Sequence, residues 1–138
     1  MPAKDIYHET VKNALVKDGW IITHDPLHLK WGTDHLYVDL GAEQLLTAEK
    51  GNRKIAVEVK SFTSHSNLAD LENALGQYIL YRNIIEELEP NRALYLAVHE
   101  EVFATVFEDS LGQMLIRKNH LKLVVFSKTE EEIIKWNE

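Results

Sequence analysis

The sequence predicts an α/β fold with a mixed β-sheet flanked by helices. Residues 54–62 alternate between apolar and polar side chains, as expected for a strand whose two faces differ. A long pattern of apolar residues at helical spacing follows over about residues 68–88. Residues 93–98 then form an unbroken apolar run, typical of a strand buried on both faces. Strand, helix and buried strand in this order predict a βαβ crossover with parallel strands.

The composition is that of one ordinary domain, which we take to span residues 1–138. Its 45% hydrophobic content suffices for one core, and no repeat or linker divides it. Cysteine is absent, which excludes disulfides, thiolate metal sites and a cysteine nucleophile. The formal charge of −7 argues against diffuse attraction to nucleic acid, so any DNA contact must be local.

Neither a signal segment nor a membrane span is expected. Residues 1–10 lack an apolar core of the kind found in signal peptides. No later segment approaches the roughly 20 apolar residues that a membrane-spanning helix needs. We therefore expect a cytoplasmic protein without membrane contact.

The amino-terminal part of the chain is predicted to alternate helix and strand. Apolar residues at helical spacing predict a helix over residues 5–17, with Asp5 able to cap it. Short strands are predicted over residues 20–24 and 36–40, with a loop at 27–34 between them. Several residues with metal-ligating side chains crowd this region, namely His24, Asp25, His28, Asp34 and His35. Their spacing matches no metal-binding pattern, so a polar loop is the favoured interpretation.

The rest of the chain completes the predicted sheet. Residues 42–50 fit neither helix nor strand well, but the turn-forming residues 50–53 favour an antiparallel hairpin leading into the strand at 54–62. Shorter helices and two outer strands are predicted after the buried strand. The helices cover residues 100–107 and 111–118, and the strands cover residues 121–126 and 133–136, with a turn at 128–131.

Asp39, Glu58 and Lys60 form the candidate site. Glu58 and Lys60 are two residues apart in a strand and therefore point to the same face. This strand is rich in valine and isoleucine, so it is expected to be central, where charged side chains need partners. Carboxylates on adjoining strands, such as Asp39 and Glu58, can converge on a hard divalent cation. Lys60 could then orient or deprotonate a water, or neutralise charge on a phosphodiester. An internal ion pair of Lys60 with a carboxylate explains the same residues without chemistry, so both interpretations stay open.

The order of these features resembles the PD-(D/E)XK nuclease superfamily, particularly its archaeal Holliday-junction resolvase and Mrr-like branches, over about residues 5–98. The resemblance implies a restriction-endonuclease-like core and a Mg²⁺-dependent (or Mn²⁺-dependent) endodeoxyribonuclease. It implies that Asp39 and Glu58 bind the metal and that Lys60 assists the attacking water. Val38 stands where the superfamily's name places proline, a common variation that leaves a ligand at Asp39 unaffected.

Two helical residues acquire roles by the same resemblance. By the resemblance, Glu9 would bind the metal directly or through a water. Its spacing alone indicates a solvent-exposed helix residue. Gln77 would support the site, although it could equally be a boundary residue of its helix. Tyr81 lies four residues after Gln77 and is expected on the same helix face.

A closer likeness runs nearly end to end and identifies the chain as similar to the cyanobacterial XisH family. The blocks that carry it are PAKD (2–5), KDGW (17–20), THDPL (23–27), DLGAE (39–43), KIAVEVKSF (54–62) and DLENALGQY (70–78). Members of this family are described as fdxN-element excision controlling factors. The likeness implies a role in excising a DNA element during heterocyst development, alongside a site-specific recombinase and a companion factor, XisI.

Two functions follow from these resemblances, and both stay open. The first is a metal-dependent endonuclease that processes DNA around the excision event. The second is a catalytically silent nuclease-fold adaptor that regulates the recombinase through protein partners such as XisI. The acidic net charge means that a nuclease would need a partner to supply further positive charge. Cutting both strands would favour a homodimer.

Overall fold

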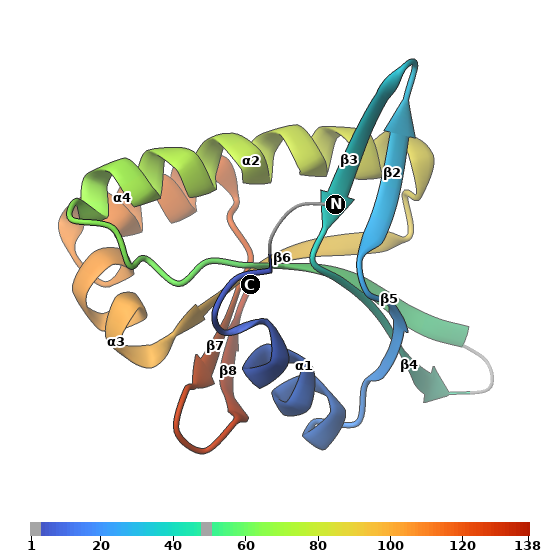
Figure 1. Ribbon diagram of the computed structural model, residues 1–138, viewed down its shortest axis with the longest axis horizontal. Coiled ribbons are helices and arrows are strands. Elements are labelled where there is room, and N and C mark those ends of the chain that lie inside the picture. The colour runs from blue at the N-terminus through green and yellow to red at the C-terminus, as the bar shows by residue number, and fades with distance from the viewer. Residues whose placement is uncertain (1–3, 48–50) are drawn as a thin grey trace.

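The computed structural model describes residues 4–47 and 51–138. Figure 1 shows a twisted sheet with helices on both sides. The helical segments are α1 (His8–Lys17), α2 (Asn67–Leu88), α3 (Glu100–Val102), the π-helical turn η1 (Phe103–Phe107) and α4 (Ser110–Asn119). The strands are β1 (Ile21–His24), β2 (Leu27–Trp31), β3 (Asp34–Val38), β4 (Leu40–Thr47), β5 (Gly51–Val59), β6 (Arg92–His99), β7 (Leu123–Ser127) and β8 (Glu132–Asn137). Within the described ranges, no helix is both long and apolar enough to cross a membrane.

The main sheet has six strands in the order β1-β4-β5-β6-β7-β8 and is mixed, as the sequence predicts. β5 and β6 are parallel, with Glu58 opposite Leu96, and α2 forms the crossover between them. β4 and β5 pair antiparallel, as do β7 and β8. β5 is therefore central, which confirms the interpretation of its valine-rich and isoleucine-rich sequence.

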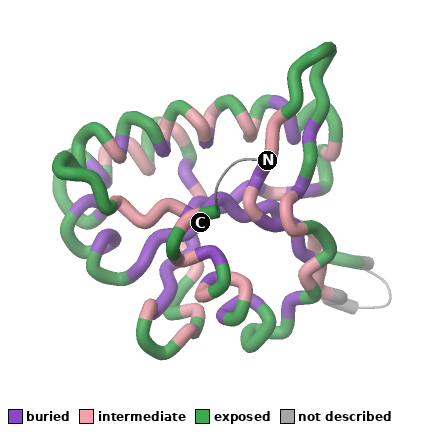
Figure 2. The backbone as a smooth tube through the Cα atoms, in the orientation of Figure 1, coloured by how far each residue is buried: buried purple, intermediate pink, exposed green. Residues whose placement is uncertain are grey.

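The two faces of the sheet are covered by different helices. On one face, Val11 and Leu15 of α1 join Val57 and Val59 of β5 in one apolar cluster. On the other face, buried residues of α2 join those of β6 in a second cluster, which includes Ala56 of β5. Figure 2 shows most of β6 and the second half of β5, residues 55–59, buried at the centre of the molecule. Alternation in β5 therefore sends Glu58 to the face covered by α2.

The structure differs from the sequence-based expectation at four places. The predicted loop at residues 27–34 is wrong, because β2 and β3 form a separate two-stranded antiparallel sheet that projects from the body (Figure 1). Leu27 and Leu29 are buried while the residues between and after them are exposed, and Gly32, with φ +62, makes the turn. The predicted strand at residues 36–40 is divided at Asp39 between β3 and β4.

The third difference lies at the first helix, which begins at His8 rather than at Asp5. The predicted strand at residues 42–50 is confirmed as far as Thr47, and residues 48–50 lie outside the described part of the chain. The fourth difference concerns the turn predicted at residues 50–53, which is wrong for its described residues because 51–53 already belong to β5. The strand predicted at 54–62 accordingly begins at Gly51 and ends at Val59. The helices and outer strands predicted after residue 99 are all present, with small shifts of their ends.

Candidate functional site

Asp39 and Glu58, which we call the acid pair, lie side by side where strands meet. Asp39 occupies the bend between β3 and β4, and Glu58 is the penultimate residue of β5. The Asp39 backbone N–H donates to Glu58 Oε1 at 3.2 Å, and the Val59 N–H donates to Asp39 Oδ2 at 2.7 Å. Glu58 is only 6% exposed. The fold thus holds two carboxyl groups together in a largely desolvated position.

Burial controls the protonation of the acid pair. It raises the pKa of Glu58 to about 8, with the charge of Asp39 as the next cause and Lys60 acting in the opposite direction. Burial also raises the pKa of Asp39, against the lowering effect of the Val59 N–H. Both shifts have the sign expected when two like charges are desolvated together. Around neutral pH the acid pair is therefore expected to hold a proton or to attract a cation.

Lys60 places its ammonium group beside the acid pair. Its Nζ lies 3.8 Å from Glu58 Oε2, and its side chain is 24% exposed. The Lys60 backbone N–H donates to the Ala97 carbonyl at 3.1 Å, which extends the pairing of β5 with β6 by one residue. Glu58 and Lys60 thus share a face, as the period of the strand predicts.

One polar side chain of α2, that of Tyr81, lies within electrostatic reach of the acid pair. The pKa of Tyr81 is raised to about 12 by burial and then by the charges of Glu58 and Asp39. Gln77 lies one turn earlier, and its Oε1 is buried without a hydrogen-bond partner among the described residues. An orphaned amide oxygen of this kind is costly unless water or a ligand satisfies it. The role of Gln77 at the acid pair stays a prediction.

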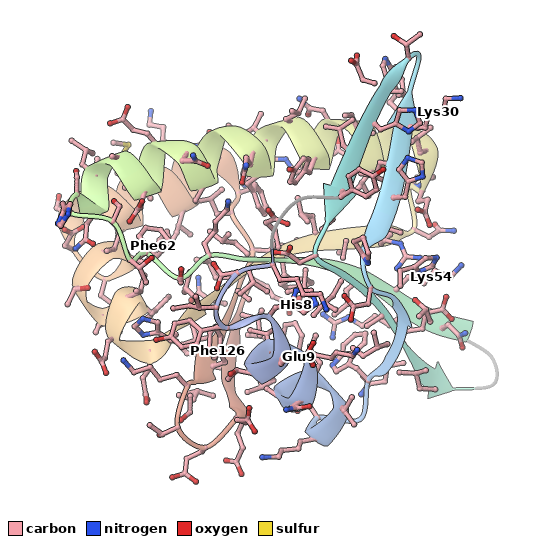
Figure 3. All side chains as sticks on the ribbon, viewed as in Figure 1. His8, Glu9, Lys30, Lys54, Phe62 and Phe126 are labelled. Atoms are coloured by element: carbon pink, nitrogen blue, oxygen red, sulfur yellow. The ribbon has the colours of Figure 1, made fainter. Side chains whose placement is uncertain are left out.

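The described contacts of Glu9 do not include the acid pair. Its side chain is 64% exposed and is 3.5 Å from the Lys4 ammonium. Its carboxylate belongs to a cluster with His8 and Asp25, in which ligand atoms lie within 4.8 Å of one another. Figure 3 labels His8 and Glu9 on α1. Among the described residues no contact joins Glu9 to the acid pair, so its role at the metal stays a prediction.

Asp25 is held in that cluster by two cationic or potentially cationic neighbours. His8 Nε2 lies 2.7 Å from Asp25 Oδ1, and Lys12 Nζ lies 2.8 Å from Asp25 Oδ2. Burial raises the pKa of Asp25, but the hydrogen bonds from Lys12 and His8 outweigh burial and keep this pKa below its usual value. Sequence reasoning treated Asp25 as part of a polar loop, because its partners on α1 are far away in the chain.

Asp5 is a residue of the site region that sequence reasoning treated only as a helix cap. Its Oδ2 accepts the Ser61 N–H at 3.1 Å, and its Oδ1 accepts the Tyr7 N–H at 2.9 Å. Together with Lys60 and Ser61 it lines a cavity of about 250 Å³. Its charge also acts on the Asp39 carboxyl. The segment before α1 is thereby tied to the loop that follows β5.

The chemistry of the acid pair fits a hard divalent cation. Both side chains offer oxygen ligands, which Mg²⁺ and Mn²⁺ prefer. Two adjacent carboxyl groups, one buried and one half-buried, repel each other when ionised, and a cation between them would remove that repulsion. Asp39 and Glu58 are the residues that would hold such an ion. When bound, the ion would supply positive charge to a phosphodiester and acidify a water molecule.

The raised pKa of Glu58 predicts how stability changes with pH. Between pH 4.5, its ordinary pKa, and about 8, the folded protein keeps a proton that the unfolded chain has lost. The free energy of unfolding therefore falls as pH rises through this window. Glu58→Gln removes this dependence. Relative to wild type, its free energy of unfolding should therefore increase between pH 4.5 and 8, by at most about 5 kcal/mol if the whole shift is realised.

Urea denaturation at a series of pH values measures this difference. Glu43→Gln is the matched control, because it alters a partly exposed carboxylate on β4 that lies 4.0 Å from Lys54. The control should follow the wild-type pH profile. A Glu58→Gln profile parallel to that of wild type would mean that Glu58 titrates as it does in the unfolded chain.

Comparisons with known proteins extend over nearly the whole chain. The family described as XisH protein matches residues 1–134. The chain is similar to the crystal structure of an XisH family protein from Nostoc punctiforme PCC 73102, with 38% identity, a TM-score of 0.88, and coverage of 97% of this chain and 100% of that one. It is also similar to a fdxN element excision controlling factor protein from Anabaena variabilis, with 40% identity, a TM-score of 0.88, and coverage of 98% and 100%. No curated protein matches the chain.

Proposed function

Because the chain belongs to the XisH family, we propose that it controls the excision of a DNA element and that its acid pair is part of a metal-dependent DNA-cleaving site. The excision role follows from the name of the Anabaena variabilis relative. The cleavage role is supported chiefly by one observation. Asp39 and Glu58 are held together, largely desolvated, with the Lys60 ammonium 3.8 Å from Glu58.

Each side chain has a role in this proposal. Asp39 and Glu58 hold Mg²⁺ or Mn²⁺, since both are positioned by backbone N–H groups rather than by flexible contacts. Lys60 orients a water or neutralises the charge that develops on the phosphate. Gln77 satisfies its buried Oε1 by positioning a water or a ligand at the site. The core around them is proposed to be restriction-endonuclease-like, which the order β4, β5, α2, β6 around the acid pair supports.

A nicking assay on supercoiled plasmid and on branched DNA tests the proposal. Wild-type protein should cleave with Mg²⁺ or Mn²⁺ and not with EDTA. Glu58→Gln should cleave at least about 100-fold more slowly, because an amide cannot replace the carboxylate at the metal. Glu43→Gln changes a carboxylate outside the site and should cleave as wild type does. Unchanged cleavage by Glu58→Gln would exclude the acid pair from the reaction.

A second function is favoured by a separate observation. Apart from Asp39 and Glu58, no carboxylate among the described residues completes a set of three ligands at the acid pair, and Glu9 lies in another cluster. The Lys60 ammonium also partly neutralises the pair. A catalytically silent nuclease-fold adaptor would need no complete set of metal ligands, and a buried acid pair neutralised by Lys60 would suffice for its fold. Such an adaptor would act through XisI and a site-specific recombinase, and its binding to XisI should survive Glu58→Gln.

A further inference from the structure

His8, the first residue of α1, carries a buried nitrogen that no hydrogen bond satisfies. The side chain is only 3% exposed. Its Nε2 lies 2.7 Å from Asp25 Oδ1, whereas its Nδ1 has no hydrogen-bond partner among the described residues. Buried polar atoms are nearly always paired, so an unpaired one points to a partner outside the protein chain. Nδ1 of His8 is such an atom.

The contact with Asp25 fixes which ring nitrogen of His8 carries the proton. A neutral imidazole has one N–H donor and one acceptor nitrogen, and a carboxylate can only accept. Nε2 is therefore the donor and Nδ1 the acceptor. Lys12 Nζ, 2.8 Å from Asp25 Oδ2, holds the carboxylate in place. Histidines at metal sites have the same arrangement, in which one ring nitrogen donates to a carboxylate and the other is directed at the site.

His8 lies beside the bend that carries Asp39. Strands β1 and β2 pair with β4 and β3 respectively, so the two residues that connect them, Asp25 and Pro26, run opposite this bend. His8 is bonded to Asp25 and is thereby held next to the bend. Burial raises the pKa of Asp39, and the charge of a protonated His8 is among the influences that oppose it. The imidazole is therefore within electrostatic reach of the acid pair.

The start of α1 is tied to both segments that carry the acid pair. The Asp5 carbonyl accepts the His8 backbone N–H at 3.0 Å, and Asp5 Oδ2 accepts the Ser61 N–H at 3.1 Å, which connects His8 to the loop after β5. The bond to Asp25 connects the His8 ring to the segment before β2. The side chain of Glu9, one residue further on, is 64% exposed. Of these two neighbours, His8 is the one whose side chain the fold buries next to the bend.

We propose that His8, rather than Glu9, is the residue through which α1 acts at the acid pair, its Nδ1 accepting a hydrogen bond from a water on the cation held there. This inference rests on the proposed metal site. Mg²⁺ held by only a few carboxylates keeps several waters, and waters in a buried site need acceptors. Nδ1 supplies one acceptor, and Asp25 keeps the ring in the required tautomer. His8 is thus a positioning residue, which orients a water without coordinating the cation itself.

Two substitutions of His8 separate the roles of its two nitrogens. The amide group of asparagine lies about as far from the backbone as Nδ1, and that of glutamine about as far as Nε2. His8→Gln keeps a donor for Asp25 but loses the acceptor at the Nδ1 position, so it should weaken metal binding by about 10-fold or more, the usual effect of losing an outer-shell partner. His8→Asn keeps an amide oxygen near the Nδ1 position and should recover part of the loss. A role confined to the bond with Asp25 predicts the opposite order.

Calorimetry of Mn²⁺ binding at pH 8, without DNA, measures these affinities, and circular dichroism shows whether each variant is folded. Glu9→Gln is the matched control, because it alters the next residue of α1, and it should bind as wild type does. If wild type binds no Mn²⁺ at millimolar concentration, both the proposed metal site and this inference fail. If wild type binds, then unchanged affinity in His8→Gln, weaker binding by His8→Asn than by His8→Gln, or equal weakening by Glu9→Gln overturns this inference alone.

Nitrogen NMR of the wild-type protein in EDTA at pH 8 supplies a test that needs neither a variant nor a metal. The His8 ring should be the tautomer with its proton on Nε2, because Asp25 accepts from that nitrogen. A proton on Nδ1 would leave no acceptor for a water and would overturn the inference.

Discussion

Lys60→Met is expected to lower the rate of DNA cleavage by about 100-fold or more while leaving metal binding within a few fold of wild type. The Lys60 ammonium lies 3.8 Å from Glu58 Oε2, close enough to act on a water or phosphate at the acid pair without being a ligand itself. Methionine keeps the length and apolar stem of lysine but removes the charge. Single-turnover cleavage at saturating metal, together with calorimetry, separates the two effects.

The assay should be run at pH 8 or above. The Lys60 charge lowers the pKa of Glu58, so its removal raises that pKa further and metal binding would otherwise be weakened by protonation. Lys54→Met is the matched control, because Lys54 lies on the same strand six residues earlier and has Glu43 as its partner, at 4.0 Å. Cleavage by Lys60→Met within a few fold of the control would remove Lys60 from the mechanism.

The second large effect is structural, and it concerns Gly112 in α4. A Cβ at this position would lie 2.2 Å from the Val106 carbonyl oxygen and 2.5 Å from the Phe107 Cα. Both are backbone atoms of η1, so neither can move aside as a flexible side chain would. Gly112→Ala should therefore lower the free energy of unfolding by about 2–4 kcal/mol. For a chain of this length the melting temperature should fall on the order of 10 °C.

Gly76→Ala provides the control for this prediction. Gly76 lies within α2, and a Cβ there would meet no atom within 4 Å. Alanine is the better helix former, so this substitution should raise the free energy of unfolding by up to about 1 kcal/mol. The same chemical change is thus expected to have opposite signs at the two sites. A melting temperature of Gly112→Ala equal to that of wild type would mean that η1 and α4 are less tightly packed than the structure shows.

The core of the fold was predictable because its signals are local. β5 alternates between apolar and polar residues with a period of two, α2 has a helical period of about 3.6, and β6 is an uninterrupted apolar run. Each pattern is long enough to identify its element. The hairpin of β2 and β3 was missed because its polar, histidine-rich side chains suggested a loop. Its two buried leucines on β2, Leu27 and Leu29, do alternate with exposed residues, and that alternation was the available signal.

Within the site, Asp39 lies beside Glu58 as the sequence predicts, although it sits in the bend between β3 and β4, and the other clear signal comes from β5. Glu58 and Lys60 share a face of one strand, so spacing alone placed them together. Asp5 and Ser61 meet across 56 residues of sequence, and His8 meets Asp25 across 17, which no local pattern reports. For Glu9, the difficulty is to predict which face of its helix the residue occupies. One residue along a helix is a rotation of about 100°, so His8 is buried while Glu9 is exposed.

Metal binding to the acid pair is the most direct test of the proposed site. Calorimetry should measure Mg²⁺ and Mn²⁺ binding to wild type, Asp39→Asn and Glu58→Gln at pH 8, without DNA, alongside unfolding measurements that show each variant is folded. The predicted result is binding by wild type that both substitutions abolish. Absence of binding by wild-type protein at millimolar metal, or binding that survives both substitutions, would contradict a metal site at Asp39 and Glu58.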